Sequence, residues 1–470
     1  MKKLTDILKN TPVREVCGDT AAAIGGLVYD SRAVKPGDCF FAVPGTQSDG
    51  HDYIPMAVEK GAAAIVCERM PADAAEGVAY VLVGDSAGAM ANMAAAFYDY
   101  PSRELKLVGI TGTNGKTTTA TLLYDLVRAM GYKAGLISTV AYKIDGREVE
   151  ATHTTPDSIR LNAMMREMAD AGCAYCFMEC SSHAIVQERT RGLDFAGGIF
   201  SNITHDHLDY HKTFAEYIRA KKLFFDHLPK GAFALTNTDD RNGRVMVQNT
   251  RAEVHTYSLR TMADFRCRIV EMHLDGMLLR LDGRELWVGL LGRFNAYNLT
   301  AVYGAAVLLG LDRDEVLRVL STLHAVSGRF EVIRASNGTT AVVDYAHTPD
   351  ALENVIQTID ELRTPQQQLL VVCGCGGDRD RTKRPEMAQI AVKYATTAIF
   401  TSDNPRHEDP EAILDEMVAG LEPGARYLRL ADRAEAIRTA VVLARPGDVI
   451  LIAGKGHETY QIVGDVKHHF

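Results

Sequence analysis

The sequence predicts an α/β protein of three domains, at about residues 1–102, 103–328 and 329–470. Its 470 residues are enough for about three domains of ~150 residues each. Apolar runs of strand length alternate with helical patterns through most of the chain, as in parallel sheets with crossover helices. Near the middle, a strand, a glycine-rich loop and a helix follow one another as in a phosphate-binding loop (P-loop). We therefore expect a central P-loop domain on a parallel sheet, with a Rossmann-like C-terminal domain.

The composition argues against several classes of protein. Hydrophobic residues make up 47% and charged residues 24%, which is ordinary for a globular protein with a large core. The net charge of -9 argues against a nucleic-acid partner. The N-terminal segment MKKLTDILKN lacks the apolar region of a signal peptide, and no run approaches the ~18 apolar residues that cross a bilayer. We expect a cytoplasmic protein without membrane insertion, whose nine cysteines are reduced thiols.

In the first domain, turn residues and apolar runs predict alternating strands and helices. Pro36-Gly37 marks a turn before the first clear strand, and Pro101 ends the last helix. Strands are expected at residues 39–43 and 63–66, and helices at 52–60 and 87–98.

The P-loop lies between Leu105 and Met130. An apolar strand leads into Thr111-Gly112-Thr113-Asn114-Gly115, then Lys116-Thr117-Thr118 and a helical pattern. Backbone N–H groups of such a loop face an anionic polyphosphate, Lys116 would reach the β- and γ-phosphates, and the Thr117 hydroxyl would contact Mg²⁺. The first glycine of the usual pattern is replaced by Ile110. A glycine-rich turn without a ligand is the alternative.

The remaining chain continues the alternation. After the P-loop helix we expect strands at 134–137 and 174–179 and a helix at 157–171, then short antiparallel strands at 254–257, 267–272, 277–281 and 285–288 and helices at 295–310 and 312–323. The third domain should have strands at 340–344, 369–373, 398–401 and 448–452, with helices near 349–363, 385–395, 410–420 and 432–443.

Several polar groups lie near the ends of predicted strands. Glu179 ends one of them, where open α/β sheets bind ligands, although a carboxylate there can also be a surface residue. The nearby Cys173, Cys176 and Cys180 with His183 could form a zinc site, or the cysteines could be small apolar residues of a buried strand. The histidines and carboxylates of 202–211 indicate a metal or catalytic role. Lys221 lies on an amphipathic helix, where a solvated lysine is the plain alternative.

Five segments resemble those of the Mur ligases in order and spacing: GTNGKTT (112–118), MECSSH (178–183), SNITHDHLDYH (201–211), Ala220-Lys221 and GRFNAYN (292–298). The resemblance spans essentially the whole chain. The family consists of ATP-dependent, amide-forming ligases of peptidoglycan precursor synthesis. The members that add the third amino acid are the most similar, on the segments DSRAVKPGDCFFAVPG (30–45), GCGGDRDRTKRP (374–385), SDNPRHEDP (402–410) and AGKGHE (453–458).

The resemblance implies roles for the nucleotide site. ATP and Mg²⁺ are the implied cofactors, and a monomer is expected. Lys116 and Thr117 would hold phosphate and a first Mg²⁺, with Glu179 and His207 on a second. Lys221 would be a carbamylated lysine, and thereby an anionic oxygen ligand. The other implied nucleotide contacts are Gly112, Thr113, Asn114, Gly115, Thr118, Asn295 and Asn298 (adenine), Arg329 and Asp344 (ribose).

The resemblance also implies two substrates, a UDP-N-acetylmuramoyl dipeptide and meso-diaminopimelate. The first would be held by Ser31 with Thr46, Gln47 and His51 on the first domain, and by Thr154, Thr155, Ser181, Gln187 and Arg189 on the second. The second would meet Asp403, Asn404, Pro405, Arg406, Arg379, Arg384, Gly454 and Glu458. Arg406 can bind the carboxylate at the far end of meso-diaminopimelate, a group that the amino acid L-lysine lacks as a substrate. Alternatively, Arg406 caps a turn and pairs with Glu408 or Asp409.

Two other hypotheses fit a P-loop. Folylpolyglutamate synthetase is a relative with a similar loop, but it lacks the DSR and DNPR segments present here. A nucleotide switch would have no evident need for Glu179, His207 and Lys221. Phosphate release that requires both a UDP-muramoyl dipeptide and an amino acid favours the ligase, and unaffected basal hydrolysis favours the switch.

Overall fold

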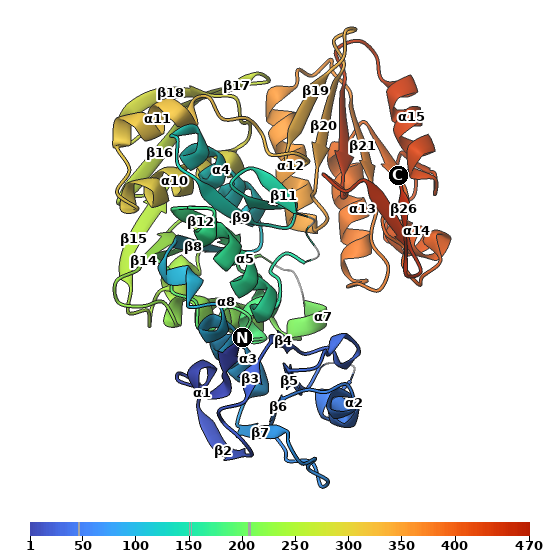
Figure 1. Cartoon of the computed structure of the whole chain (residues 1–470). Helices are drawn as coiled ribbons and strands as arrows, with labels where there is room; N and C mark the ends of the chain where they lie inside the picture. Colours follow the sequence, from blue (N-terminus) through green and yellow to red (C-terminus); the bar gives the residue numbers. More distant parts are fainter. Residues whose placement is uncertain (46–47, 150, 152, 205–207) are drawn as a thin grey trace.

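The computed structural model describes residues 1–45, 48–149, 151, 153–204 and 208–470. Its architecture is three large sheets flanked by helices, with five, eleven and six strands in chain order (Figure 1). The predicted α/β class is confirmed. None of the helices in these ranges is long and apolar enough to cross a membrane.

The N-terminal sheet has the strand order β2-β7-β6-β5-β4, and β2 is its one antiparallel member. Its strands are β2 (Val13–Cys17), β4 (Gly26–Val28), β5 (Asp38–Phe41), β6 (Ala64–Cys67) and β7 (Ala79–Val83), and β1 (Lys2–Lys3) pairs with β3 (Ala23–Ile24) beside it. The helices are α1 (Leu4–Ile7), α2 (Ile54–Glu59) and α3 (Ser86–Phe97), with 3₁₀ turns η1 (Ser31–Ala33), η2 (Gly50–Tyr53) and η3 (Pro101–Arg103). Helix α3 begins where Asp85 accepts a hydrogen bond from Gly88 N.

The central sheet has the order β11-β10-β9-β12-β8-β13-β14-β15-β16-β17-β18, parallel from β9 to β16 with an antiparallel hairpin at each edge. Its strands are β8 (Lys106–Thr111), β9 (Ala134–Ile137), β10 (Tyr142–Ile144), β11 (Arg147–Val149), β12 (Tyr175–Glu179), β13 (Gly197–Phe200), β14 (Phe233–Asn237), β15 (Glu253–Ser258), β16 (Phe265–His273), β17 (Gly276–Leu281) and β18 (Arg284–Val288). The helices are α4 (Lys116–Ala129), α5 (Ser158–Asp170), α6 (Ser182–Val186), α7 (Leu208–His211), α8 (Phe214–Asp226), α9 (Gly243–Met246), α10 (Arg293–Leu308) and α11 (Arg313–Leu320).

One prediction for this sheet is wrong. The pattern predicts an antiparallel strand at residues 254–257, but β15 runs parallel to both β14 and β16. The chain between β14 and β15 includes the short helix α9, which returns it to the starting end of the sheet. The three strands that follow, β16 to β18, are antiparallel to one another as expected.

The C-terminal sheet has the order β19-β20-β24-β21-β22-β23, with β19 antiparallel. Its strands are β19 (Glu331–Arg334), β20 (Thr340–Asp344), β21 (Leu369–Cys373), β22 (Thr397–Phe400), β23 (Tyr427–Arg429) and β24 (Val449–Ala453), followed by the hairpin of β25 (Tyr460–Val463) and β26 (Val466–His469). The helices are α12 (Pro349–Leu362), α13 (Lys383–Tyr394), α14 (Pro410–Val418) and α15 (Arg433–Leu443).

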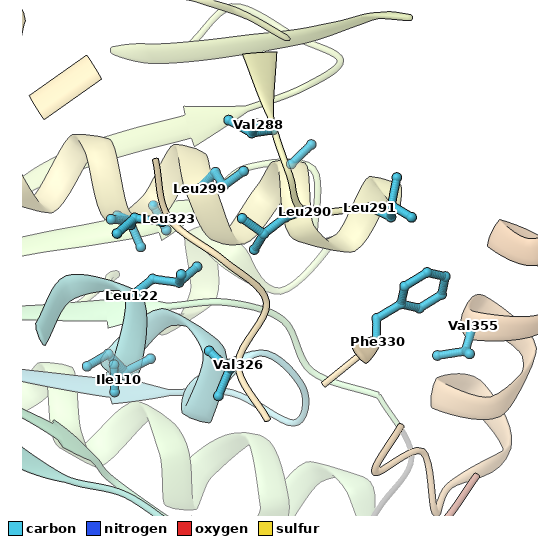
Figure 2. Close-up of a cluster of buried hydrophobic side chains, with 14 of the residues drawn as sticks. Ile110, Leu122, Val288, Leu290, Leu291, Leu299, Leu323, Val326, Phe330 and Val355 are labelled. Atoms are coloured by element: carbon cyan, nitrogen blue, oxygen red, sulfur yellow. The ribbon is translucent and has the colours of Figure 1, made fainter. Parts of the chain in front are cut away.

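The main hydrophobic core extends from the central sheet into the C-terminal part of the chain. Phe330, at 2% exposure, belongs to the same buried cluster as Ile110 of β8 and Val355 of α12. Figure 2 shows Phe330 beside Val355, and Val326 on the side of the cluster where Leu122 and Ile110 lie. The centroid of the Phe330 ring also lies 5.6 Å from that of Phe294, at the start of α10. This apolar contact sets the two sheets side by side (Figure 1).

Candidate active site

The P-loop joins β8, in the middle of the central sheet, to α4. Gly112 and Gly115 both have positive φ, of 153° and 85°. A Cβ on Gly112 would lie 1.9 Å from Ser201 Oγ, and one on Gly115 would lie 2.5 Å from Asn298 Oδ1. Only glycine fits either position. Ile110, by contrast, is a fully buried strand residue paired with Glu179 and Ile199, which accounts for the missing first glycine.

Polar contacts hold this loop from both sides. Lys116 Nζ donates to the carbonyls of Gly112 and Thr113, at 2.9 and 2.8 Å. From the end of β13, Ser201 Oγ donates to Asn114 O at 2.6 Å, and Asn202 Oδ1 accepts from Asn114 N at 3.0 Å. The lysine ammonium therefore already lies over the loop, where a polyphosphate would need a cation.

Glu179 and Lys221 lie beside the loop, and each is only 1% exposed. Glu179 ends β12, next to β8, and its Oε1 accepts from Thr139 N at 2.7 Å. Lys221 extends from α8 and donates from Nζ to Gly112 O at 2.7 Å, with the Tyr217 ring centroid 4.6 Å away. The alternative of a solvated lysine is therefore wrong. The predicted metal ligand His207 lies outside the described residues.

A cavity of about 570 Å³ connects these groups. It is lined by the loop and by Glu179, Lys221, Asn298, Arg329 and Asp344, together with Thr154 and Ser181 from the predicted substrate site. Asn295 lies behind this wall: it is 2% exposed, its Nδ2 donates to Leu291 O, and its Oδ1 accepts from Asn298 Nδ2. The family resemblance assigns both Asn295 and Asn298 to the adenine site, but of the two only Asn298 lines the cavity.

The cavity is closed on one side by the C-terminal part of the chain. Arg329 Nη2 donates to Thr117 Oγ1 at 3.2 Å, and Asn114 Nδ2 donates to Asp350 Oδ2 of α12 at 3.1 Å. Burial raises the pKa of Asp350. Asp350 has no signal of its own in the sequence, because an acid in the first turn of a helix is typical of an ordinary surface residue.

Asp344 was predicted to meet the ribose. Its two carboxylate oxygens accept from Phe330 N and Ala346 N, both at 2.7 Å, and burial raises its pKa. In this structure Asp344 therefore fixes the backbone of the connection between the sheets while it lines the cavity.

The predicted contacts for the UDP substrate cluster at the carboxyl end of β12. Arg189 donates to Gln187 Oε1 and, at 2.6 Å, to Thr155 O. Thr155 Oγ1 donates to Glu179 O at 2.7 Å, and Ser181 caps α6 by accepting from Ala184 N. Thr154 Oγ1 pairs with Thr139 Oγ1 at 3.0 Å. The structure thus brings these five predicted residues together.

Of the UDP-substrate contacts predicted on the first domain, only some can be placed. Ser31 is buried in η1. Burial raises the pKa of Tyr29, two residues earlier. The charge of Asp157 raises this pKa further, and the charge of Arg189 lowers it. His51 is occupied within its own unit, since Nδ1 lies 2.6 Å from Asp49 Oδ1 and Nε2 accepts from Glu68 N. Thr46 and Gln47 lie outside the described residues.

The predicted acceptor residues meet at the carboxyl ends of β22 and β24. Arg406 Nη1 donates to Gly377 O at 2.8 Å. Burial lowers the Arg406 pKa, and the nearby Arg379 guanidinium lowers it further. Two cations this close favour an anion between them. The alternative pairing of Arg406 is not found: within the described chain, Glu408 pairs with Arg381 and Arg384, and Asp409 caps α14.

The other acceptor residues have distinct surroundings. A Cβ on Gly454, which has a φ of 111°, would lie 2.8 Å from Asp403 Oδ2, a buried oxygen without a protein hydrogen bond in the described chain. Asn404 Nδ2 donates to Glu458 Oε2 at 3.1 Å, and Pro405 is buried beside them. Arg384 is fully buried and bonded to Glu408 and Glu416, so it supports the fold rather than lining the pocket.

The Arg406 backbone has a φ of 51°, which a non-glycine residue adopts only when its surroundings impose it. Arg406 N donates to Ile462 O, and its carbonyl accepts from Gly464 N. The hairpin of β25 and β26, which the sequence analysis did not predict, therefore holds the arginine in place.

Comparisons with known proteins agree with this geometry. The family descriptions "Mur ligase family, catalytic domain", "Mur ligase middle domain" and "Mur ligase, glutamate ligase domain" match residues 23–98, 110–306 and 328–456. The chain is 55% identical over 470 residues to the UDP-N-acetylmuramoyl-L-alanyl-D-glutamate--2,6-diaminopimelate ligase of Phocaeicola vulgatus, covering 100% of this chain and 97% of that one. It is 44% identical over 476 residues to the ligase of the same name from Geobacillus thermodenitrificans, covering 98% and 96%.

Solved structures give the same result. A structure of a ligase with that name matches with a TM-score of 0.71 at 33% identity, covering 100% of this chain and 97% of that one. MurF from Thermotoga maritima in complex with ADP shares the fold, with a TM-score of 0.63 at 19% identity, covering 92% and 94%. The chain belongs to the Mur ligase family.

Proposed function

We propose that this protein uses ATP to join meso-2,6-diaminopimelate to UDP-N-acetylmuramoyl-L-alanyl-D-glutamate, in peptidoglycan precursor synthesis. The observation that carries the proposal is the convergence of Lys116 and Lys221 on the Gly112 carbonyl, with Glu179 of the adjacent strand. A second, cationic site at Arg379 and Arg406 of the C-terminal part would receive the amino acid. The substrates themselves are those in the names of the relatives at 55% and 44% identity.

The chemistry needs a nucleotide because a carboxylate is a poor acylating agent. The carboxylate of the UDP-dipeptide would take the γ-phosphoryl group of ATP, releasing ADP and forming an acyl phosphate. The acceptor amine would then attack the carbonyl carbon, lose its proton and expel phosphate, leaving an amide. Lys116 would neutralise charge on the transferring phosphoryl group.

The donor set fits Mg²⁺. The Thr117 hydroxyl would hold a first ion beside the phosphates. The Glu179 carboxylate would hold a second, with His207 and a carbamylated Lys221 by family resemblance. Within the described chain, no three His, Cys, Asp or Glu side chains cluster as a metal site, and Mg²⁺ needs only one or two carboxylates with substrate phosphates. When bound, the ion would offset the repulsion between carboxylate and phosphate.

We further propose a division of labour among three domains. Residues 1–102 would hold the UDP group, residues 103–328 ATP, and residues 329–470 the amino acid. The contact between Asn114 and Asp350 supports closure of the third domain over the P-loop. Such closure would position the amine and keep water from the acyl phosphate.

Phosphate release tests the proposal. We expect it to require ATP, the UDP-dipeptide and meso-diaminopimelate together, and to reject L-lysine by a large factor. A site that pairs a charged group discriminates by as much as ~10⁴-fold against an analogue lacking it. Hydrolysis that ignores both substrates would instead indicate a nucleotide switch, and equal use of L-lysine would overturn the acceptor assignment.

A further inference from the structure

Lys455 is a buried cation among the predicted acceptor residues. Lys455 follows β24 and is 3% exposed. Its Nζ donates to Asn404 Oδ1 at 2.9 Å and to Glu458 Oε2 at 2.8 Å. A buried ammonium is costly unless it is paired and hydrogen-bonded, and Lys455 is both. It therefore links two residues already assigned to the acceptor.

Lys455 fixes the orientation of the Asn404 amide. Asn404 Oδ1 also accepts from Ile462 N at 2.9 Å. The lysine ammonium and the backbone N–H can only donate, so the amide oxygen must face them. The Asn404 NH₂ group is thereby directed at Glu458, to which it donates at 3.1 Å.

The same arrangement decides which Glu458 oxygen is available. Oε2 accepts from both Lys455 and Asn404, whereas Oε1 has no hydrogen bond within the described part of the chain. The Glu458 side chain is 13% exposed, so it is partly open to solvent. One oxygen is thus held by the protein, and the other remains for an incoming donor.

The charges of the pocket divide accordingly. Glu458 is paired with Lys455. Asp403 lies near the buried Arg433: burial lowers the pKa of Arg433, and the charge of Asp403 partly offsets this effect. Arg406 Nη1 and Arg379 Cγ both lie close to Gly376, at 3.0 and 3.8 Å from where a Cβ would stand. These two guanidinium groups form no ion pair with a protein carboxylate in the described chain, so they are left to bind an anion.

We propose that Lys455 is a positioning residue of the acceptor site, which holds Asn404 and Glu458 so that Glu458 Oε1 receives the distal ammonium of the amino acid. The inference rests on the proposed function and adds a residue to it. Lys455 acts through Glu458 and does not touch the acceptor. Its pairing with Glu458 also leaves Arg379 and Arg406 as the groups that demand a carboxylate.

The test is steady-state kinetics on the full chain with Lys455→Met, Glu458→Gln and the double variant. We expect Lys455→Met to raise the KM for meso-diaminopimelate by about 10-fold or more, as for the loss of a hydrogen bond to a charged group. The KM for ATP and the kcat at saturating acceptor should change less than about twofold, because the P-loop lies on another sheet. A purely structural role would not single out one KM.

The double variant tests the coupling. If Lys455 acts through Glu458, adding Lys455→Met to Glu458→Gln raises the acceptor KM less than about twofold further. The double variant also removes both members of the buried pair, so it remains informative if Lys455→Met alone unfolds. Lys467→Met is the matched control. Lys467 Nζ lies 4.4 Å from the ring centroid of Tyr460, and Lys455 Nζ lies 5.6 Å from the same centroid. Lys467 is on the exposed β26, so the kinetics of its variant should equal wild type.

Two outcomes overturn the inference without touching the proposed function: an unchanged acceptor KM in folded Lys455→Met, or independent effects of the two substitutions. Failure of the wild type to use meso-diaminopimelate would refute the proposed function instead.

Discussion

Replacement of Lys116 by alanine separates the stability of the P-loop from its chemistry. The Lys116 ammonium donates to two loop carbonyls, Gly112 O and Thr113 O, at 2.9 and 2.8 Å. Net contributions of ~0.5–1.5 kcal/mol for each such bond give a loss of about 1–3 kcal/mol in the free energy of unfolding. A change of that size lowers the melting temperature by only several degrees in a domain of this size.

The effect on turnover should be larger. Removing one preorganised group that stabilises transition-state charge costs ~10²–10³-fold in kcat, equivalent to about 2.7–4 kcal/mol. The assay is phosphate release at saturating ATP, UDP-dipeptide and meso-diaminopimelate, at a temperature where thermal unfolding shows the variant to be folded. Lys133→Ala is the control, because its exposed ammonium bonds Ala171 O away from the cavity.

A folded Lys116→Ala variant that kept more than about a tenth of wild-type turnover would refute a catalytic role. A melting temperature lowered with normal turnover per folded molecule would show that the ammonium serves the loop alone.

Three further predictions follow from the site. Lys221 should carry a carbamate in the active enzyme, so ¹³C-bicarbonate should give an NMR carbamate signal that Lys221→Ala lacks. Bicarbonate or a short-chain acid should partly restore the activity of that variant. A bare ammonium at Lys221 in a nucleotide-bound crystal would contradict the prediction. Arg406→Ala should raise the KM for meso-diaminopimelate by about 10-fold or more and leave that for ATP unchanged, since the lost group pairs a carboxylate; equal rises in both would point to a disturbed fold. Burial lowers the pKa of His457 to about 4, so between about pH 6.5 and 4 the unfolded chain binds a proton that the folded chain does not, and the free energy of unfolding falls as the pH falls. Denaturant titrations across this range should show a shallower fall for His457→Gln, and an unchanged slope would count against the buried neutral imidazole.

The sequence by itself determined the elements that depend on local pattern. The apolar periodicity of α4 and the run of β8 placed the P-loop within a residue of its observed position, because strand, glycine turn and helix each have a local signature. The family segments likewise placed Glu179 at the end of β12 and Asn298 on α10, and both line the cavity.

Only the tertiary structure decided the direction of β15, the burial of Lys221 and the division of work between Asn295 and Asn298. Each depends on contacts between residues far apart in sequence. A lysine on an amphipathic helix looks solvated until Gly112 is found 2.7 Å from its ammonium. In the same way, the roles of Asp350 and Lys455 depend on Asn114 and on Asn404, partners 236 and 51 residues away. Local pattern fixes where the chain forms helices and strands, whereas the partner of a buried charge is set by how those elements pack.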